Sequence, residues 1–192
     1  MDDFSFYCSL GWHHIISWDA LDHLLFILAL CAIYLLNNWK QVLVLVTAFT
    51  IGHSLTLALS VYDVIRVNAR LVEFLIPCTI MTTAVFNFFQ KKFDRKSLRL
   101  NYFLALFFGL IHGMGFANTI RFMLAKDQHM AMPLFSFNLG LEAGQIAVVT
   151  VILFISYITV NKAGLNRKWW VWGLSGISFL VALKMAVERF NG

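Results

Sequence analysis

Charged residues are scarce in this sequence, and their scarcity excludes a soluble monomer. Asp, Glu, Lys and Arg make up 13% of the 192 residues, whereas hydrophobic residues make up 60%. Soluble domains are about 25% charged and roughly 45–50% apolar. A soluble fold of this length needs more surface charge than the chain contains, so the apolar residues must face lipid.

Two signals of secreted proteins are also missing. The three cysteines, Cys8, Cys31 and Cys78, show no paired spacing. They therefore predict neither a disulfide framework nor a Cys-x-x-Cys metal site. The N-terminal segment 1–4 lacks a basic start and a small-residue cleavage site. We therefore expect no removable signal peptide.

What is present is a series of long apolar blocks. A spanning helix needs about 20 apolar residues, whereas the strands of a membrane barrel alternate over about ten. The blocks lie at about 19–36, 41–61, 71–89, 102–124, 133–160 and 169–187. We predict an all-α protein, a polytopic transmembrane helical bundle of six membrane-spanning helices. It forms a single transmembrane domain over residues 1–192.

The basic residues predict how this bundle is oriented in a bacterial-type inner (plasma) membrane. Nine of the 15 collect on one set of alternate loops, among them Lys40, the run at 91–99 and Arg167-Lys168. Short loops rich in Lys and Arg face the cytoplasm. Both termini are therefore expected outside. Basic loops beside a bilayer also account for the net charge of +5, so we expect lipid and no nucleic acid as a partner.

Ionisable and polar residues inside the apolar blocks are the functional candidates. A charge at the centre of a spanning helix costs roughly 2.5–3.5 kcal/mol on insertion scales, so few are retained without a role. The ionisable candidates within the blocks are Asp19, Asp22, His23, His53, His112 and Glu142, with Ser54, Asn138 and Gln145 beside them. His14, which lies just before the first block, is added to them. Helical spacing puts Asp19, Asp22 and His23 on one face, and Asn138, Glu142 and Gln145 on another.

The rise of a helix brings these residues to one depth. His53 and His112 each lie about 11 residues from the inner start of their blocks, roughly 16–18 Å. Asp22, His23 and Glu142 reach the same layer from the other side. Imidazoles and carboxylates gathered at low dielectric are typical of a divalent metal site. We predict that the seven ionisable candidates are metal ligands and that Ser54, Asn138 and Gln145 support them.

The residue types narrow the metal to Zn, Ni or Co. No cysteine joins the layer, which disfavours a soft Cu(I) site, although Met114 beside His112 is compatible with copper. Structural explanations remain open for individual residues. Asp19 and Asp22 also suit a helix cap and an acidic first turn. A single histidine, or Glu142 with Gln145, also suits a hydrogen bond between helices.

Small residues repeat every four positions in two of the blocks. Ala105, Gly109, Gly113 and Ala117 form one such stripe, and Gly140 and Gly144 form another. Stripes of this kind let neighbouring helices approach closely. We expect close helix packing along both.

Linked motifs over about positions 10–150 carry a family resemblance. They are His14-(x)4-Asp19-(x)2-Asp22-His23-Leu-Leu-Phe, Thr50-Ile-Gly-His53-Ser54-Leu-Thr, Val72-Glu73 with Asn87, Phe108-Gly-Leu-Ile-His112-Gly-Met-Gly-Phe-Ala, and Phe137-Asn138-Leu-Gly-Leu-Glu142-Ala-Gly-Gln145. In this order they resemble the HupE/UreJ family of membrane accessory proteins found beside nickel hydrogenases and ureases. The resemblance implies a six-helix membrane protein that handles nickel or cobalt. Its partners are then the bilayer, the metal ion, and either a second copy or a metalloenzyme maturation protein.

Three functions fit these features. A metal sensor or chaperone partner is the least favoured, and the other two are a permease and a hydrolase. The first is a nickel/cobalt (or zinc) permease with an outward-facing site. In the inner half of the bundle, the polar residues available to an ion that moves inward are all uncharged, for example Thr82, Thr83 and Asn87. The alternative is an intramembrane metal-dependent (zinc) hydrolase acting on a lipid or amide. Its residue set is similar to that of the alkaline ceramidase and adiponectin-receptor superfamily, where zinc activates water. We favour the permease and leave catalysis open.

Overall fold

The computed structural model describes residues 3–89, 95–124 and 130–191, without the side chains of Asp19, 95–97, 117–124 and Asn191. The described residues are almost entirely helical and contain no strand, which confirms the predicted all-α class. The helices are α1 (Asp3–Ile16), α2 (Leu21–Cys31), α3 (Trp39–Val61), α4 (Ala69–Phe89), α5 (Arg95–Leu124), α6 (Ala131–Ser156) and α7 (Arg167–Asn191). Short 3₁₀ turns occupy Trp18–Ala20 and Leu36–Asn38, and a π-helical turn, Tyr157–Lys162, follows α6.

Five of the described helical segments are long and apolar enough to cross a membrane. They are Leu36–Val61, Ala69–Phe89, Leu98–Phe116, Ala131–Lys162 and Arg167–Phe190. The pair α1 and α2 meets the same test only together, across a bend of 66°. Counted as one span, this pair makes six, so the predicted polytopic bundle is confirmed.

The prediction of one continuous helix over 19–36 is wrong. The helical region begins at Asp3, breaks between α1 and α2, and α2 ends at Cys31. At the break Ser17 adopts an extended backbone, with φ −71° and ψ 153°. Ser and Asp favour such breaks because their side chains compete for backbone hydrogen bonds. The polar pair His13-His14 also dilutes the hydropathy of α1, which hides this helix from a search for apolar blocks.

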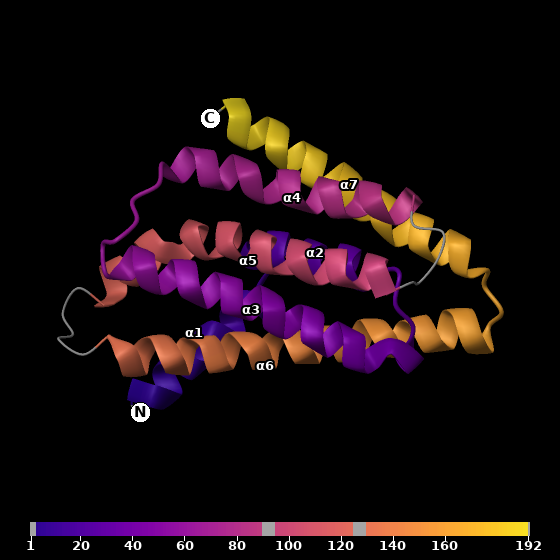
Figure 1. The fold of residues 1–192 in the computed structure, drawn as a ribbon, viewed down its shortest axis with the longest axis horizontal. Coiled ribbons are helices and arrows are strands. Elements are labelled where there is room, and N and C mark those ends of the chain that lie inside the picture. Colours follow the sequence, from indigo (N-terminus) through magenta and orange to yellow (C-terminus); the bar gives the residue numbers. More distant parts are fainter. Residues whose placement is uncertain (1–2, 90–94, 125–129, 192) are drawn as a thin grey trace.

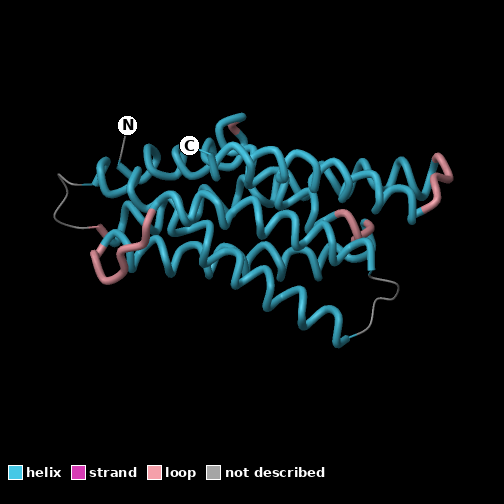
Figure 2. Tube along the Cα trace, turned by 90° about the horizontal axis from the view of Figure 1, so that it is seen from above, coloured by secondary structure: helices cyan, strands magenta, loops and turns pink. Residues whose placement is uncertain are grey.

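The long helices α3 to α7 run roughly along one axis (Figure 1). The closest packing is in three pairs, α3 with α5, α1 with α6, and α4 with α7. Seen from above, most loops lie near the two ends of the bundle (Figure 2). We call the end with the connection 62–68, toward which both termini lie, the terminal end. The opposite end, with Leu36–Asn38 and 163–166, is the loop end.

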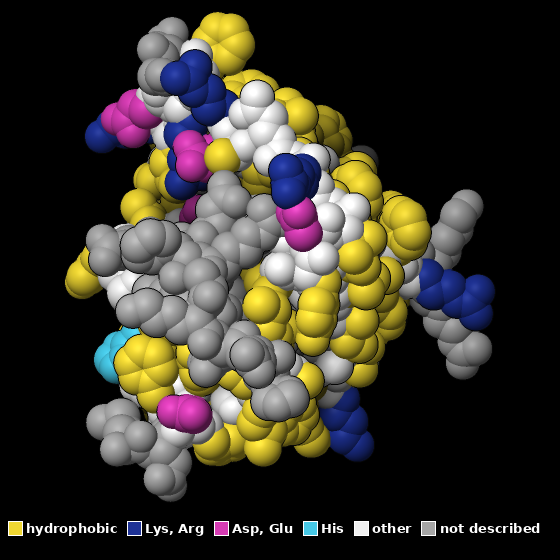
Figure 3. Space-filling model, turned by 90° about the vertical axis from the view of Figure 1, so that its left-hand side faces the viewer, with side chains coloured by type: hydrophobic (Ala, Val, Ile, Leu, Met, Phe, Trp, Pro, Cys, Tyr) yellow, Lys and Arg dark blue, Asp and Glu magenta, His cyan; other side chains and the backbone are white. Residues whose placement is uncertain are grey.

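The outer faces of the helices are apolar. Large hydrophobic side chains stay exposed on every long helix, for example Val151, Phe154 and Leu180. A view onto the terminal end shows hydrophobic side chains along the flanks and acidic and basic side chains gathered at the end itself (Figure 3). This distribution suits a bundle whose sides contact lipid.

Glycines set the spacing of the closest helix pairs, as the small-residue stripes predict. A methyl group at Gly113 of α5 would overlap the carbonyl oxygen of His53 on α3. One at Gly140 of α6 would overlap the carbonyl oxygen of Cys8 on α1. Backbone contact of this kind fixes the distance from α3 to α5 and from α1 to α6. It also fixes the position of His53.

Replacing Gly113 by alanine is expected to lower stability and to displace His53. The added methyl group meets backbone that cannot rotate away, and overpacking of this kind costs about 1–3 kcal/mol. The midpoint of thermal unfolding in detergent measures the loss. Gly176→Ala on α7 is the matched control, because a methyl group there meets nothing within 4 Å. Equal stability of the two variants would contradict the close approach of α3 and α5.

Candidate metal centre

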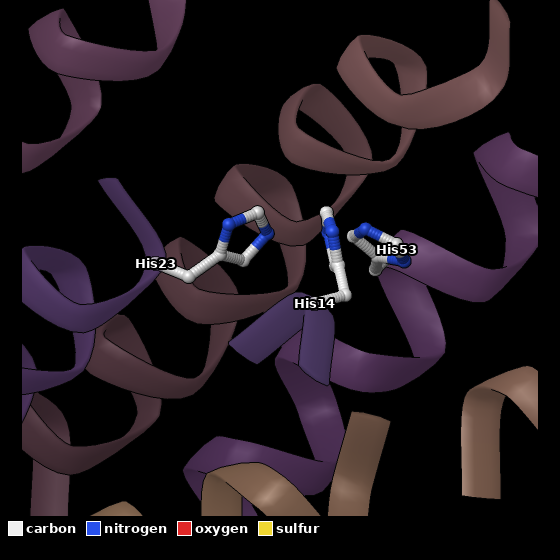
Figure 4. A group of neighbouring side chains, drawn as sticks. All are labelled: His14, His23 and His53. Carbon is white, nitrogen blue, oxygen red and sulfur yellow. The ribbon is translucent and has the colours of Figure 1, made fainter. Parts of the chain in front are cut away.

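Three histidine side chains from three helices converge inside the bundle. His14 lies in the last turn of α1, His23 in the first turn of α2 and His53 within α3. One ring nitrogen from each lies within 4.8 Å of the others. Figure 4 shows the His14 ring between those of His23 and His53. We call these three residues the histidine cluster.

The break between α1 and α2 is what brings His14 and His23 together. In an unbroken helix their nine-residue separation corresponds to about 13.5 Å along the axis. In the structure their ring centroids are 4.7 Å apart. Broken spanning helices are a common way to build ion sites at membrane depth. The break therefore has a direct role in forming the cluster.

His112 on α5 is a fourth imidazole beside the cluster. Its ring centroid lies 5.1 Å from that of His23. Its Nδ1 lies 2.9 Å from the backbone oxygen of Phe108, to which it donates a hydrogen bond. A neutral ring that donates from Nδ1 has a free lone pair on Nε2. His112 is thus fixed with Nε2 as its available ligand atom.

Five imidazole nitrogens of this region have no hydrogen-bond partner among the described residues. Among the described residues, none hydrogen-bonds to Nε2 of His14, His23 or His112, or to either ring nitrogen of His53, although all are buried. A buried polar group without a partner costs roughly 1–3 kcal/mol. Four such rings in one place are well explained by a shared partner that accepts nitrogen lone pairs. A divalent metal ion fits that requirement.

Asp22 and Arg189 form a chain of contacts behind His23. Oδ1 of Asp22 accepts a hydrogen bond from Nδ1 of His23 at 3.0 Å. Its Oδ2 lies 3.3 Å from a guanidinium nitrogen of Arg189 on α7, whose other terminal nitrogen donates to the backbone oxygen of Glu73 at 2.8 Å. Since a carboxylate only accepts, the contact leaves Nε2 of His23 free for a ligand. Asp22 is therefore placed to orient His23.

Arg189 was not among the site residues predicted from the sequence. The signal that could have found it is a single arginine in the last turn of the last spanning helix, at the depth expected for Asp22. Its contact with Asp22 joins residues 167 positions apart. Such a pairing depends on which helices are neighbours.

Glu142 and its neighbours on α6 contact a different face of α3 from the one that carries His53. Oε1 of Glu142 accepts a hydrogen bond from Thr47 at 2.8 Å, and Oε1 of Gln145 accepts one from Thr50 at 2.7 Å. Glu142, Ser54 and Asn138 line a pocket of about 300 Å³ between α3 and α6, which none of the histidines lines. The structure thus does not bring these predicted site residues to the histidine cluster. The side chain of Asp19, the remaining predicted ligand, lies outside the described part of the chain.

A larger pocket of about 360 Å³ opens beside the cluster. We call it the histidine pocket. Two of its lining residues, the exposed Glu73 and the half-buried Arg189, lie near the start of α4 and the end of α7, both at the terminal end. The full lining is His14, Ser17, Ala20, Asp22, His23, Glu73, Ile76, His112, Gly115, Phe116 and Arg189.

Aromatic rings close the opposite side of the site. Each of His23, His53 and His112 has a phenylalanine one turn nearer to the loop end, namely Phe26, Phe49 and Phe108. Phe26 lies 4.9 Å from Phe49 and 5.9 Å from Phe108 between ring centroids. All three are buried. This aromatic layer separates the histidines from the loop end.

Comparison with known protein families gives a match over nearly the whole chain. The family described as HupE / UreJ protein matches residues 1–189, essentially the whole chain. No curated protein and no solved structure matches the chain.

Proposed function

We propose, from the premise that this chain belongs to the HupE/UreJ family, that it takes up a nickel or cobalt ion at the histidine cluster and carries it across the membrane. The observation that supports this most is the convergence of His14, His23 and His53, whose nitrogen atoms lie within 4.8 Å of one another. The ion is the cargo in this proposal.

The imidazole nitrogens of the cluster suit a nickel or cobalt ion. Neutral imidazole binds Ni, Co and Zn well, whereas thiolates favour softer ions. No cysteine lines the histidine pocket. The choice of nickel or cobalt over zinc comes from the family, because imidazole ligands alone accept all three.

The site is open on one side and closed on the other, and this indicates the side from which the ion enters. The histidine pocket includes residues of the terminal end, and the aromatic layer closes the site toward the loop end. Basic residues such as Lys40, Lys162 and Arg167 are concentrated at the loop end. By the positive-inside rule, we orient the loop end to the cytoplasm of a bacterial-type inner membrane. The site then opens outward, and both termini lie outside.

Transfer inward requires the aromatic layer to open. Beyond it, Thr83, Asn87 and Asn101 line a cavity of about 20 Å³ together with Phe108. Asn87 donates hydrogen bonds to the backbone oxygen of Ala29 and to Ser175. A transporter exposes its site to each side in turn, and the broken α1–α2 pair can absorb such a rearrangement.

Substituting the residues beyond the layer should separate transport from binding. We expect Thr83→Val and Asn87→Leu to reduce uptake about tenfold or more, because a hydrogen bond to a charged group is worth about 1.5–3 kcal/mol. Metal affinity should stay unchanged, as neither residue lines the histidine pocket. The measurements are radiometal uptake into proteoliposomes and equilibrium dialysis. Thr82→Val is the control, because Thr82 is exposed on the outer face of α4; a reduction equal to that of Thr83→Val would contradict the route.

A metal-dependent hydrolase is the second candidate, and one observation favours it. Three histidines beside an open pocket are the ligand arrangement of catalytic zinc sites, which keep one position for water. Ser17 and Asp22 line the same pocket and would orient that water. The buried aromatic layer also fits a site that never opens inward.

One experiment decides between the two candidates. Purified protein in proteoliposomes is given radioactive Ni²⁺ or Co²⁺, and the same preparation is screened for hydrolysis of lipid amides and esters. Uptake that depends on His23 and His112 supports the permease. Tight retention of the metal without uptake, together with consumption of a substrate, supports the hydrolase.

A further inference from the structure

The histidine pocket has more room than a bare ion needs. Its volume is about 360 Å³, whereas one water molecule takes up about 30 Å³. A metal ion at the cluster would therefore leave space for a small organic molecule. That space extends from the histidines to Arg189 and Glu73, which line the same pocket.

Among the side chains that the structure describes, the negative charge around the cluster is too small to balance a divalent ion. The four imidazoles are neutral when they act as ligands. The adjacent carboxylate, that of Asp22, contacts the guanidinium of Arg189 and is itself largely buried, with 13% of its side chain exposed. Glu73 adds one further acid, but its side chain is exposed. With these described groups alone, a bound dication would keep uncompensated positive charge at low dielectric, which is costly.

Arg189 supplies the complementary group for an anion. Its two terminal nitrogens each make one contact, with Asp22 and with the backbone oxygen of Glu73. A guanidinium has five N–H donors, so three remain after these contacts. Arginine binds carboxylates through paired hydrogen bonds, and its charge opposes the entry of a bare cation. Ser17 adds a hydroxyl group to the same lining.

From the volume, the charge and the position of Arg189, we infer that the histidine pocket takes its metal as a complex with a small carboxylate-bearing chelator. The histidines bind the metal, and Arg189 binds a carboxylate of the chelator. This inference rests on the proposed metal binding and specifies the form in which the metal is bound. The chelator provides the negative charge that the described pocket residues lack.

Equilibrium dialysis of the full-length protein in detergent tests the inference, with ⁶³Ni²⁺ and ¹⁴C-citrate as probes. Three samples contain Ni²⁺ alone, citrate alone, or Ni²⁺ with an excess of citrate. We expect the third to retain both labels in about equal amounts, because the pocket accepts the complex. A bare-ion site instead loses its nickel to excess citrate. Loss of nickel in the third sample, or nickel retained without citrate, would overturn the inference.

Substitutions of Arg189 and Lys184, two basic residues of α7, test where the carboxylate of the chelator binds. Arg189→Gln should reduce citrate retention at least about tenfold, whereas Arg189→Lys, which keeps the charge without the paired donors, should reduce it less. Lys184→Gln is the matched control, since the side chain of Lys184 is exposed and pairs with Glu188. Binding of Ni²⁺ alone should persist in Lys184→Gln, and in Arg189→Gln it should fall much less than citrate retention, because Arg189 also contacts Asp22. If Arg189→Gln and Arg189→Lys both retain citrate like Lys184→Gln, Arg189 does not bind the chelator.

The design separates this inference from the proposed function. If wild-type protein binds no Ni²⁺ in any sample, the proposed metal binding itself fails. If Ni²⁺ alone binds and citrate removes it, metal binding stands and only the chelator is refuted. If Arg189→Gln loses Ni²⁺ alone to the same extent as it loses citrate, Arg189 acts only by positioning Asp22 and His23, and its assigned role is refuted.

Discussion

Replacing His53 by alanine is expected to remove metal binding, with an affinity loss of at least about 100-fold. Substitution of groups that only orient a ligand typically costs 10–100-fold, so loss of a ligand itself should exceed that. His53 is fully buried, and no described residue bonds to its ring nitrogens. Its imidazole therefore contributes little through hydrogen bonding to the metal-free fold. We expect the largest effect in the metal-bound protein.

Thermal unfolding measured with and without Ni²⁺ tests this expectation. A ligand at 100 times its Kd stabilises the folded state by about 2.7 kcal/mol, and this increment should vanish in His53→Ala. His13→Ala is the control, because His13 adjoins His14 in sequence but its side chain is exposed. It should keep the increment. A metal-induced shift that survives in His53→Ala would place the ion elsewhere.

The helical fold and the depth of the histidines could be predicted from the sequence because both depend on local information. The length of an apolar block sets a span, and the rise per residue sets the depth along it. Those rules predicted that His23, His53 and His112 lie at one depth in the membrane. In the structure their rings are neighbours. The glycine stripes were equally readable, since Gly113 does meet the backbone of α3.

The rotation of each helix about its axis could not be predicted. Depth places Glu142 level with the histidines, but packing decides which way its side chain points. In the structure it faces Thr47 rather than the cluster. The break between α1 and α2 was hidden for a related reason. Fourteen residues of α1 are too few to span alone, so the helix becomes recognisable only through its packing against α6.

The break also explains why His14 belongs to the cluster although it lies outside every predicted apolar block. Its ring contacts Phe116 and Phe137, at centroid distances of 3.9 Å and 5.7 Å, so α5 and α6 hold it in place. Movement of α1 against α6 would therefore move His14, one of the proposed ligands, without moving His23 or His53. A permease can release its ion in this way.

Asp22→Asn is expected to weaken metal binding about 10–100-fold, the usual effect of removing a carboxylate that orients a histidine ligand. The amide keeps the size of the side chain but loses the charge that favours donation by Nδ1 of His23. It also loses the ionic contact with Arg189, which lies 3.3 Å away. Equilibrium dialysis with ⁶³Ni²⁺ measures the change.

Glu142→Gln is the matched comparison, since it makes the same acid-to-amide change in another spanning helix. The glutamine can still accept the hydrogen bond from Thr47, and its side chain lines the pocket between α3 and α6. Affinity should therefore stay within about twofold of the wild-type value, a difference below 0.5 kcal/mol. If Glu142→Gln instead loses as much affinity as Asp22→Asn, Glu142 reaches the metal in the bound state, as its depth in the sequence predicts. Helix α6 would then have to rotate on binding, and the site of the metal-bound protein would differ from the one described.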